Sequence, residues 1–233
     1  MRILVTRPRE DGAEIARLLS ARGQQPLLAP LLEPRFHNGP LPDDAAAQLD
    51  AAAAILATSA NGIRALVRQT ARRDWSIFAV GPQTADEARR AGFAQVRSAD
   101  GDAKALAEAV RAWAPPESRL IHICAEDAQA TLSDRLGDHG FRVSRLMLYR
   151  IEPATELSPT VRAALQNREL DAVMFFSPRT ASIFASLAQA VPTDTLTALC
   201  ISQATAHALV PLLFAQIRIA ERPNQEAMLA LVE

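Results

Sequence analysis

The stretch Ile-Phe-Ala-Val-Gly-Pro-Gln-Thr-Ala, residues 77–85, predicts a short buried strand that runs directly into a helix. Its first four residues are apolar and include β-branched residues, which is typical of a strand inside a sheet. Gly81 permits a sharp turn, and Pro82 suits the first helical position because its missing N–H has no partner there anyway. The backbone N–H groups of Gln83 and Thr84 then point out of a helix N-terminus, which binds anions without any special side chain. An ordinary strand-to-helix connection has the same pattern.

A similar unit recurs in the second half of the chain, with further matching segments on either side of it. The matching pairs are 78–85 with 199–206, 93–97 with 214–218, and 55–59 with 173–177. The chain therefore reads as an internal duplication in which each copy ends its strands in helix N-termini. Several related turns in register favour an anion-binding role over a set of unrelated connections.

The composition is that of a soluble globular protein. The chain has 233 residues, of which 49% are apolar and 22% charged, enough for one large or two small domains. No apolar run is long enough to span a membrane, and residues 1–8 read as a first strand rather than a signal peptide. We therefore expect a cytoplasmic protein. The net charge of −1 argues against a general nucleic-acid binder.

The patterns that usually hold cofactors or metals do not occur in the sequence. The two cysteines, Cys124 and Cys200, lie in expected strands, where buried reduced thiols are typical. The four histidines show no metal-ligand spacing. Neither a glycine-rich phosphate loop nor a serine nucleophile elbow is present. The sequence thus predicts neither a cofactor nor a metal.

Segments with strand character alternate with segments with helix character, which calls for parallel sheets covered on both faces. About ten strands are too many for a single sheet in a chain of this size, so we expect two five-stranded α/β domains. Residues 33–40 and Glu152-Pro153 read as linkers. The expected strands are 2–6, 26–32, 51–58, 75–80, 94–97, 120–124, 143–151, 172–176, 199–201 and 216–220, and the expected helices are 10–22, 61–70, 82–91, 103–113, 126–136, 159–166, 178–189 and 225–232.

In parallel sheets of this kind, ligands bind at the carboxyl ends of the strands. If the two domains face each other, these strand ends line one cleft. The strand ends carry Thr6-Arg7, Ser59, residues 81–84, Ala125-Glu126, Ser177 and residues 202–205.

A series of short motifs along the whole chain resembles the uroporphyrinogen-III synthase family. The motifs are residues 5–8 (Val-Thr-Arg-Pro), 58–62 (Thr-Ser-Ala-Asn-Gly), 80–85 (Val-Gly-Pro-Gln-Thr-Ala), 148–150 (Leu-Tyr-Arg), 176–178 (Phe-Ser-Pro) and 222–224 (Arg-Pro-Asn). The resemblance implies two flavodoxin-like α/β domains with parallel sheets, joined by a two-stranded linker. It also implies that residues 1–35 and 152–233 form the first domain and residues 36–151 the second. The repeat alone favours tandem halves divided near Pro116, but Pro115-Pro116 reads equally well as a loop, so we follow the resemblance.

The resemblance implies a cofactor-free cyclising lyase of tetrapyrrole biosynthesis, which serves haem, chlorophyll or cobalamin. The reaction would close the linear tetrapyrrole hydroxymethylbilane to uroporphyrinogen III, with inversion of ring D and loss of water. Such catalysis rests mainly on holding one conformation of the substrate. The substrate's acetate and propionate groups match helix N-termini. The small-molecule substrate is the one partner implied, with no nucleic acid and no membrane, and the protein is expected to be a monomer.

The same resemblance supplies the candidate site residues. Tyr149, the only tyrosine, is the catalytic candidate, as a donor to the departing hydroxyl group. A partly buried structural tyrosine is the alternative, and helix capping or a solvated strand end would equally explain the other residues. The candidate substrate-binding residues are Arg7, Ser59, Ala60, Gln83, Thr84, Ser177, Ser202 and Thr205.

Three positions depart from the family pattern. An acidic segment, Ala125-Glu126-Asp127, stands where an Arg-Gly turn is common and would repel an anionic substrate unless its carboxylates point away. Residues 202–204 (Ser-Gln-Ala) replace Gly-Pro-Thr, and Arg179 replaces a small residue. The acidic segment keeps open a catalytically degenerate homologue that binds a tetrapyrrole or a protein partner. From fold alone, a flavodoxin-like ligand-binding protein is a third possibility.

Overall fold

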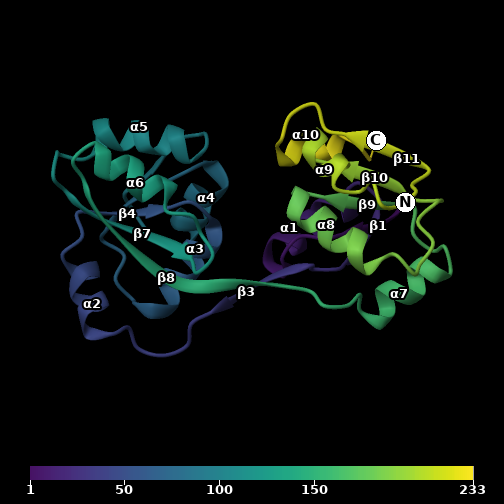
Figure 1. Ribbon diagram of the computed structural model, residues 1–233, viewed down its shortest axis with the longest axis horizontal. Coiled ribbons are helices and arrows are strands. Elements are labelled where there is room, and N and C mark those ends of the chain that lie inside the picture. Colours follow the sequence, from purple (N-terminus) through teal and green to yellow (C-terminus); the bar gives the residue numbers. More distant parts are fainter. Residues whose placement is uncertain (233) are drawn as a thin grey trace. The chain divides into compact units, whose positions relative to one another are not determined.

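The computed structural model describes residues 1–232 and divides the chain into two compact units (Figure 1). The first unit combines Met1–Glu33 with the chain from Glu152 onward, and the second is Pro34–Ile151. Each unit contains its own sheet with helices packed on both faces. The α/β class with parallel-dominated sheets is therefore confirmed.

The first unit has a five-stranded, fully parallel sheet in the order β11-β10-β9-β1-β2. Parallel strands need helical crossovers between them, and this unit supplies one for each connection within it. Its strands are β1 (Arg2–Val5), β2 (Gln25–Leu28), β9 (Ala172–Phe175), β10 (Thr197–Cys200) and β11 (Gln216–Ile219). Its helices are α1 (Arg9–Ser20), α7 (Pro159–Gln166), α8 (Pro178–Leu187), α9 (Gln203–His207) and α10 (Gln225–Ala230).

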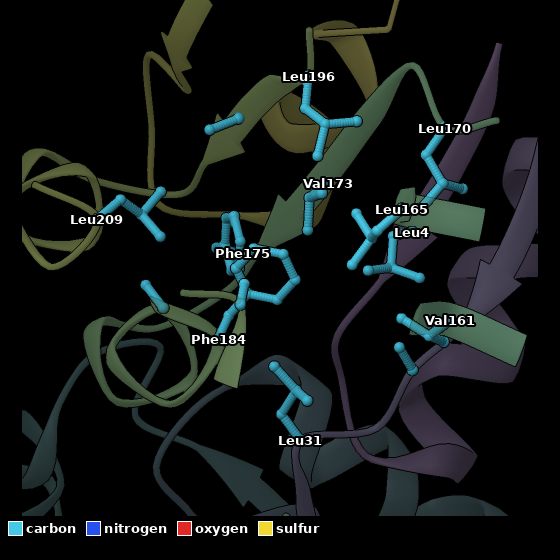
Figure 2. Close-up of a cluster of buried hydrophobic side chains, with 14 of the residues drawn as sticks. Leu4, Leu31, Val161, Leu165, Leu170, Val173, Phe175, Phe184, Leu196 and Leu209 are labelled. Carbon is cyan, nitrogen blue, oxygen red and sulfur yellow. The ribbon is translucent and has the colours of Figure 1, made fainter. Parts of the chain in front are cut away.

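The first unit has an apolar core on each face of its sheet. Because successive side chains of a strand point to opposite faces, Leu4 joins one core while Ile3 and Val5 join the other. Figure 2 shows the first of these cores, where Phe175 and Phe184 meet edge to face with ring centroids 5.2 Å apart. Burial on both faces explains why these strands are apolar at every position rather than at alternate ones.

The second unit has a six-stranded sheet in the order β3-β8-β7-β4-β5-β6. Its strands are β3 (Leu32–Phe36), β4 (Ala54–Ala57), β5 (Ser76–Ala79), β6 (Val96–Ser98), β7 (Arg119–Ala125) and β8 (Arg142–Pro153). Its helices are α2 (Asp43–Asp50), α3 (Ala60–Gln69), α4 (Pro82–Arg90), α5 (Ala103–Trp113) and α6 (Thr131–Asp138). The ladder from β8 to β6 is parallel throughout.

Strands β3 and β8 contain the two points at which the chain passes between the units. The His37 N–H donates to the Leu148 carbonyl at 2.9 Å, and the Ala154 N–H donates to the Leu31 carbonyl at 3.0 Å. Residue numbers fall along β8 as they rise along β3, so the two strands run antiparallel. Both crossing points are thus held by a hydrogen-bonded strand pair.

The segments that repeat in the sequence occupy equivalent places in the two sheets. The order β2-β1-β9-β10-β11 in the first unit corresponds to β8-β7-β4-β5-β6 in the second. Of these five corresponding strands, each sheet takes two from one half of the chain and three from the other, and β3 adds a sixth strand to the second sheet. The internal duplication stays a prediction from sequence, and Pro116 lies in a loop between α5 and β7, inside the second unit.

Several local predictions were wrong. Glu152-Pro153 was expected as a linker but lies at the end of β8, and the second sheet has six strands rather than the expected five because β3 joins it. Residues 33–36 were expected as a linker but lie in β3, an edge strand in which proline is tolerated because one side of the strand makes no ladder bonds. Helix α2 was not expected at all. The helix expected from Glu126 begins at Thr131, because the Glu126 N–H donates to the Tyr149 carbonyl at 2.9 Å and so continues the sheet.

Candidate active site

The hydroxyl groups of Ser59 and Tyr149 meet at the carboxyl edge of the second sheet. Ser59 follows β4 and caps α3, where its Oγ accepts the Asn61 N–H at 3.1 Å. Tyr149 lies on β8, with its hydroxyl group close enough to Ser59 for that side chain to lower the pKa of the phenol. Its neighbour in the ladder is Ala125 of β7, whose small side chain leaves room for a ring that reaches across β7 toward the end of β4. The sheet thus brings together two residues that are far apart in sequence.

Tyr149 is a buried phenol, with 5% of its surface exposed. Burial raises its pKa, the nearby Ser59 side chain opposes that shift, and the charges of Cys124 and Asp127 add to the rise. The phenol therefore keeps its proton at neutral pH. Its ring packs against Phe36, with centroids 6.1 Å apart, within the apolar core of this face. Packing holds the ring, and the hydroxyl group lies at the start of a helix.

Helix α3 approaches the sheet closely beside this pair. A Cβ on Gly62 would lie 3.2 Å from the Ile123 carbonyl oxygen, so only glycine fits without displacement. Ala60, the first residue of α3, is also buried. The residues from Thr58 to Gly62 therefore place a helix N-terminus next to the end of β7.

The turn at Gly81 is the one of the four related turns that has no side-chain cap. Ser59, Ser177 and Ser202 each accept a backbone N–H of the helix that follows, whereas Gly81 has no side chain to do so. The first-turn N–H groups of Gln83 and Thr84 therefore have no capping acceptor from the N-cap residue of α4. The Gln83 side chain is exposed and that of Thr84 is buried. This helix N-terminus is the one best suited to an anion.

Two identical caps lie at the carboxyl edge of the first sheet. Ser177 accepts the Thr180 N–H at 3.2 Å, and the two hydroxyl oxygens are 2.8 Å apart. Ser202 accepts the Thr205 N–H at 3.3 Å, and their hydroxyl oxygens are 3.0 Å apart. Thr205 is fully buried. Helix capping therefore accounts for the local structure of both serines and of Thr205.

Arg7 is neither exposed nor solvated. Its guanidinium donates to Asp11 at 2.9 Å, and the two side chains are 15% and 11% exposed. The guanidinium also lies 4.9 Å from the centre of the Phe176 ring, beside Ser177. The alternative of a solvated strand end is therefore wrong, and Asp11 balances part of the charge of Arg7.

The acidic segment after β7 has a basic partner. The Glu126 carboxylate lies 2.7 Å from His37 Nε2, with both side chains about half exposed. Its backbone is fixed by the N–H bond to Tyr149. An exposed pair of this kind adds little stability, but it sets the direction of the carboxylate. Sequence reasoning missed His37, since only the fold brings residues 37 and 126 together.

A buried ion pair joins the helices that follow Ser59 and Gly81. Arg64 on α3 donates to Asn61 at 3.0 Å and to Glu87 on α4 at 3.1 Å. Arg64 is buried, and the Glu87 side chain is 15% exposed. The pair fixes the first turn of α3 relative to α4. The sequence did contain one signal for this ion pair, because Arg64 is a lone charged residue among the apolar residues Ile63, Ala65 and Leu66.

His122 is a buried histidine on β7. It is 2% exposed, and its Nε2 lies 3.2 Å from Thr58 Oγ1, one residue before Ser59. Burial first, and the charge of Arg145 second, lower its pKa to about 4. His122 is therefore neutral at physiological pH. Sequence reasoning found no role for it.

Within residues 1–232, no cluster of three or more histidine, cysteine or acidic residues has the geometry to hold a metal ion. In the same range, none of the helices combines the length and the apolar character needed to cross a membrane.

A family profile described as uroporphyrinogen-III synthase HemD matches residues 13–230 of this chain. The chain belongs to the uroporphyrinogen-III synthase family. The match runs through both units, so the family assignment applies to the whole two-unit arrangement rather than to one sheet.

Two curated relatives agree with the family. The porphyrin biosynthesis protein HemD of Ruminiclostridium josui is 28% identical over 224 residues, which make up 89% of this chain and 43% of that protein. The uroporphyrinogen-III synthase of Schizosaccharomyces pombe is 29% identical over 119 residues, 48% of this chain and 45% of that protein. The chain thus spans less than half the length of the curated relatives it matches.

Solved structures from the family share the fold. The uroporphyrinogen-III synthetase of Helicobacter pylori superposes with a TM-score of 0.66 at 18% identity, covering 100% of this chain and 98% of that one. A mutant uroporphyrinogen III synthase of Thermus thermophilus gives a TM-score of 0.53 at 21% identity, covering 100% and 97%. At these identities the likeness establishes the fold alone.

Proposed function

We propose that this chain converts hydroxymethylbilane to uroporphyrinogen III, with inversion of ring D and loss of one water. Membership of the uroporphyrinogen-III synthase family over residues 13–230 supports this reaction. The structural observation that carries it is the buried phenol of Tyr149 close to Ser59, next to a helix N-terminus at the carboxyl edge of a parallel sheet.

The reaction itself asks for little covalent chemistry from the protein. Departure of the hydroxyl group of ring A leaves an electrophilic azafulvene, and ring D attacks it through a substituted carbon to give a spiro intermediate. This intermediate reopens and closes with ring D inverted. Since the free substrate closes without inversion, the protein acts mainly by holding one conformation. Holding the substrate in one conformation requires hydrogen-bond donors and turns that bind its carboxylate groups.

The hydroxyl pair leaves one hydrogen for the substrate. Tyr149 and Ser59 have two hydroxyl hydrogens between them, and a bond between the two groups would use one. If Tyr149 donates to Ser59, the Ser59 hydroxyl is left to donate, and in the reverse case the Tyr149 hydroxyl is left. In either arrangement the remaining hydrogen can be donated to the hydroxyl group that departs from ring A. Tyr149 is thus our catalytic candidate, with Ser59 as its partner.

Carboxylate groups of the substrate would bind at the helix N-termini. Gln83 and Thr84 of the uncapped α4 turn are the strongest candidates, because no N-cap side chain occupies their N–H groups. In the first unit, the Arg7 guanidinium lies over the ring of Phe176, the residue before Ser177, and would bind a substrate carboxylate in competition with Asp11. The remaining candidates, Ala60, Ser177, Ser202 and Thr205, contribute through the first turns of their helices.

The test is direct. The purified chain is incubated with freshly prepared hydroxymethylbilane, and the isomers of the cyclised product are resolved by chromatography after oxidation. We expect uroporphyrin III to dominate, whereas the control without protein gives uroporphyrin I. An isomer ratio equal to the control would rule the proposal out.

A second candidate function is a homologue that binds a tetrapyrrole or a protein partner without turnover. The acidic residues Glu126 and Asp127 at the end of β7 favour it, because they lie at the edge where an anionic substrate would bind. The orientation of Glu126 toward His37 weakens that argument. Tight binding of uroporphyrinogen in a separate titration, together with an isomer ratio equal to the control in the assay above, would select this alternative.

We also propose that the two compact units are the two domains and that the chain crosses between them in β3 and β8. A cytoplasmic, monomeric protein remains our expectation from the family resemblance. Limited proteolysis would test the division, since cleavage should leave both units folded. Light scattering after gel filtration would test the monomer.

A further inference from the structure

A hollow at the opposite edge of the second sheet has the features of a second small-molecule site. It has a volume of about 420 Å³ and lies over the first residues of β7 and β8, against α2. The volume is within the usual range for small-ligand sites, roughly 300–1,000 Å³. Its lining includes Arg119 and Ile121 of β7, Arg142 and Ser144 of β8, and Ala47 and Gln48 of α2.

Two arginines form one end of this hollow. Arg119 and Arg142 are directly paired in the parallel ladder, so their side chains leave the same face of neighbouring strands, about 4.8 Å apart at the backbone. Like charges directly opposite one another in a sheet are unfavourable. Neither guanidinium has a carboxylate or a hydrogen-bond acceptor within bonding distance among the residues that the structure describes. Both side chains are exposed at the starts of their strands, so two positive charges without a fixed counter-charge stand at adjacent positions of the sheet.

The rest of the lining is mostly apolar, with two neutral polar groups. Ala47 and Ala51 of α2 and Ile121 of β7 offer an apolar wall, and Ser144 and Gln48 each add a hydrogen-bonding side chain. Two guanidiniums beside an apolar wall suit an oxyanion joined to a short hydrocarbon part, because arginine binds carboxylate and phosphate oxygens in pairs. A bare inorganic anion would leave the apolar wall unused.

We propose that this hollow binds a small organic anion, with a carboxylate or phosphate head between Arg119 and Arg142 and a hydrocarbon part against Ala47 and Ile121. The site is separate from the candidate active site. Arg119 and Ala125 are six positions apart along β7, which is about 20 Å at the rise of an extended strand. Binding here would therefore act on the sheet from its amino edge, independently of whether the proposed reaction takes place at the other edge.

The test measures binding of n-butyl phosphate, butyrate, inorganic phosphate and butanol by calorimetry at constant ionic strength. We expect saturable binding of butyl phosphate or butyrate, weaker binding of inorganic phosphate and none of butanol. The tighter of the two organic anions identifies the head group. No saturable binding of either up to about 10 mM, or equal binding of butanol, overturns the proposal.

Variants locate the site. The double variant Arg119→Gln with Arg142→Gln should weaken binding about tenfold or more, since charge-assisted hydrogen bonds are lost. Arg135→Gln is the matched control, because Arg135 is an exposed arginine on α6 that does not line the hollow. Ala47→Leu should reduce the preference for butyl phosphate over inorganic phosphate while keeping both charges. Equal affinities in the double variant and the control would overturn the site.

A measurement without ligand checks that the arginines have no structural role. Because neither guanidinium has a native partner, the melting temperature of the Arg119→Gln and Arg142→Gln variants should stay at or slightly above that of the unmodified chain. A fall of several degrees in either would mean that the guanidinium already has a structural role in the fold, and this would count against the proposal.

Discussion

Tyr149 of β8 lies close to Ser59 at the start of α3, and Ser59 lowers the pKa of the phenol, although ninety positions of sequence separate the two residues. The Ser59 oxygen also accepts the Asn61 N–H, so it joins a helix cap to a buried phenol. Each of the two residues thus has a structural role, Ser59 as a helix cap and Tyr149 as a core side chain, in addition to its proposed role in catalysis. The two roles can be separated by substitutions that remove one hydroxyl at a time.

Replacing Tyr149 with phenylalanine keeps the ring and removes only the donor. Loss of one neutral hydrogen bond costs about 1 kcal/mol, roughly fivefold in rate, while loss of general acid assistance costs on the order of a hundredfold or more. We expect a decrease between these limits, with uroporphyrinogen III still the main isomer. Initial rates for each isomer, with thermal unfolding alongside, provide the measurement. An unchanged rate would exclude the acid role, and a large fall in melting temperature would support a structural one.

Ser59→Ala tests the partner of that phenol. It should lower stability by about 1 kcal/mol through loss of the α3 cap, and it should lower the rate as well. If the two hydroxyls act as one unit, the double variant with Tyr149→Phe loses little more activity than the worse single variant. Fully additive losses in rate would show that the hydroxyls act separately.

The uncapped α4 turn is tested at Gln83. Gln83→Pro removes a backbone N–H from the first turn of α4, whereas Gln83→Ala keeps it and alters only an exposed side chain. We expect the proline variant to show a several-fold higher KM and the alanine variant to resemble the unmodified chain. Circular dichroism of the proline variant serves as the control for helix content. Equal KM values in the two variants would remove this turn from the substrate site.

Glu126→Gln tests whether the acidic segment opposes the substrate. The exposed pair with His37 contributes at most about 1 kcal/mol, so the melting temperature should barely change. If the carboxylate repels an anionic substrate, its removal lowers KM, and the effect shrinks as salt is added. The measurement is KM at low and at high ionic strength. A KM that does not respond to either change places Glu126 away from the substrate.

His122 should make stability depend on pH. Its pKa in the folded chain is about 4, below the unperturbed value of about 6.5, so the unfolded chain binds the extra proton between these values. Stability is therefore complete above pH 6.5 and falls as the pH drops toward 4, by at most about 3 kcal/mol. Denaturant unfolding at a series of pH values measures the slope, and His122→Asn should flatten it. A variant with the same slope as the unmodified chain would contradict this assignment.

Arg64→Met should destabilise the second unit, because the exposed Arg90 is then the one ion-pair partner left to the largely buried Glu87 among residues 1–232. We expect a loss of roughly 1–3 kcal/mol in the free energy of unfolding. Adding Glu87→Gln should recover part of that loss, since the buried charge is removed as well. The double-mutant cycle in denaturant gives the coupling between the two. No recovery in the double variant would mean that packing of Arg64, rather than its charge, matters.

Most of the fold could be predicted because its signals are local. Continuous apolar runs mark strands that are buried on both faces, and Pro82, Ser158 and Ser177 mark helix starts within one turn of sequence. The failures were also local. Strand β3 contains a proline that reads as a breaker, and the start of α6 was misplaced because a sheet hydrogen bond from β8 claims the Glu126 N–H.

The candidate site divides in a similar way. Motif positions such as Ser59, Gly81 and Ser202 could be found from sequence, because a cap acts on residues two or three positions away. The partners of these residues could not. Arg7 and Asp11 are four residues apart at the start of α1, so their pairing could be predicted from sequence. The proximity of Tyr149 to Ser59 and of His37 to Glu126 depends on strand order.

The sequence by itself determined most of the elements and the family pattern, because helix caps, periodicity and short motifs act over a few residues, but it missed α2 and β3. The tertiary structure decided which strands share a sheet. Each sheet combines strands from both halves of the chain, and only that pairing places Tyr149 against Ser59, Arg64 against Glu87, and Arg119 beside Arg142. The physical reason is that contacts across a sheet depend on strand order and register, which are set by the burial of two whole apolar faces rather than by any single segment.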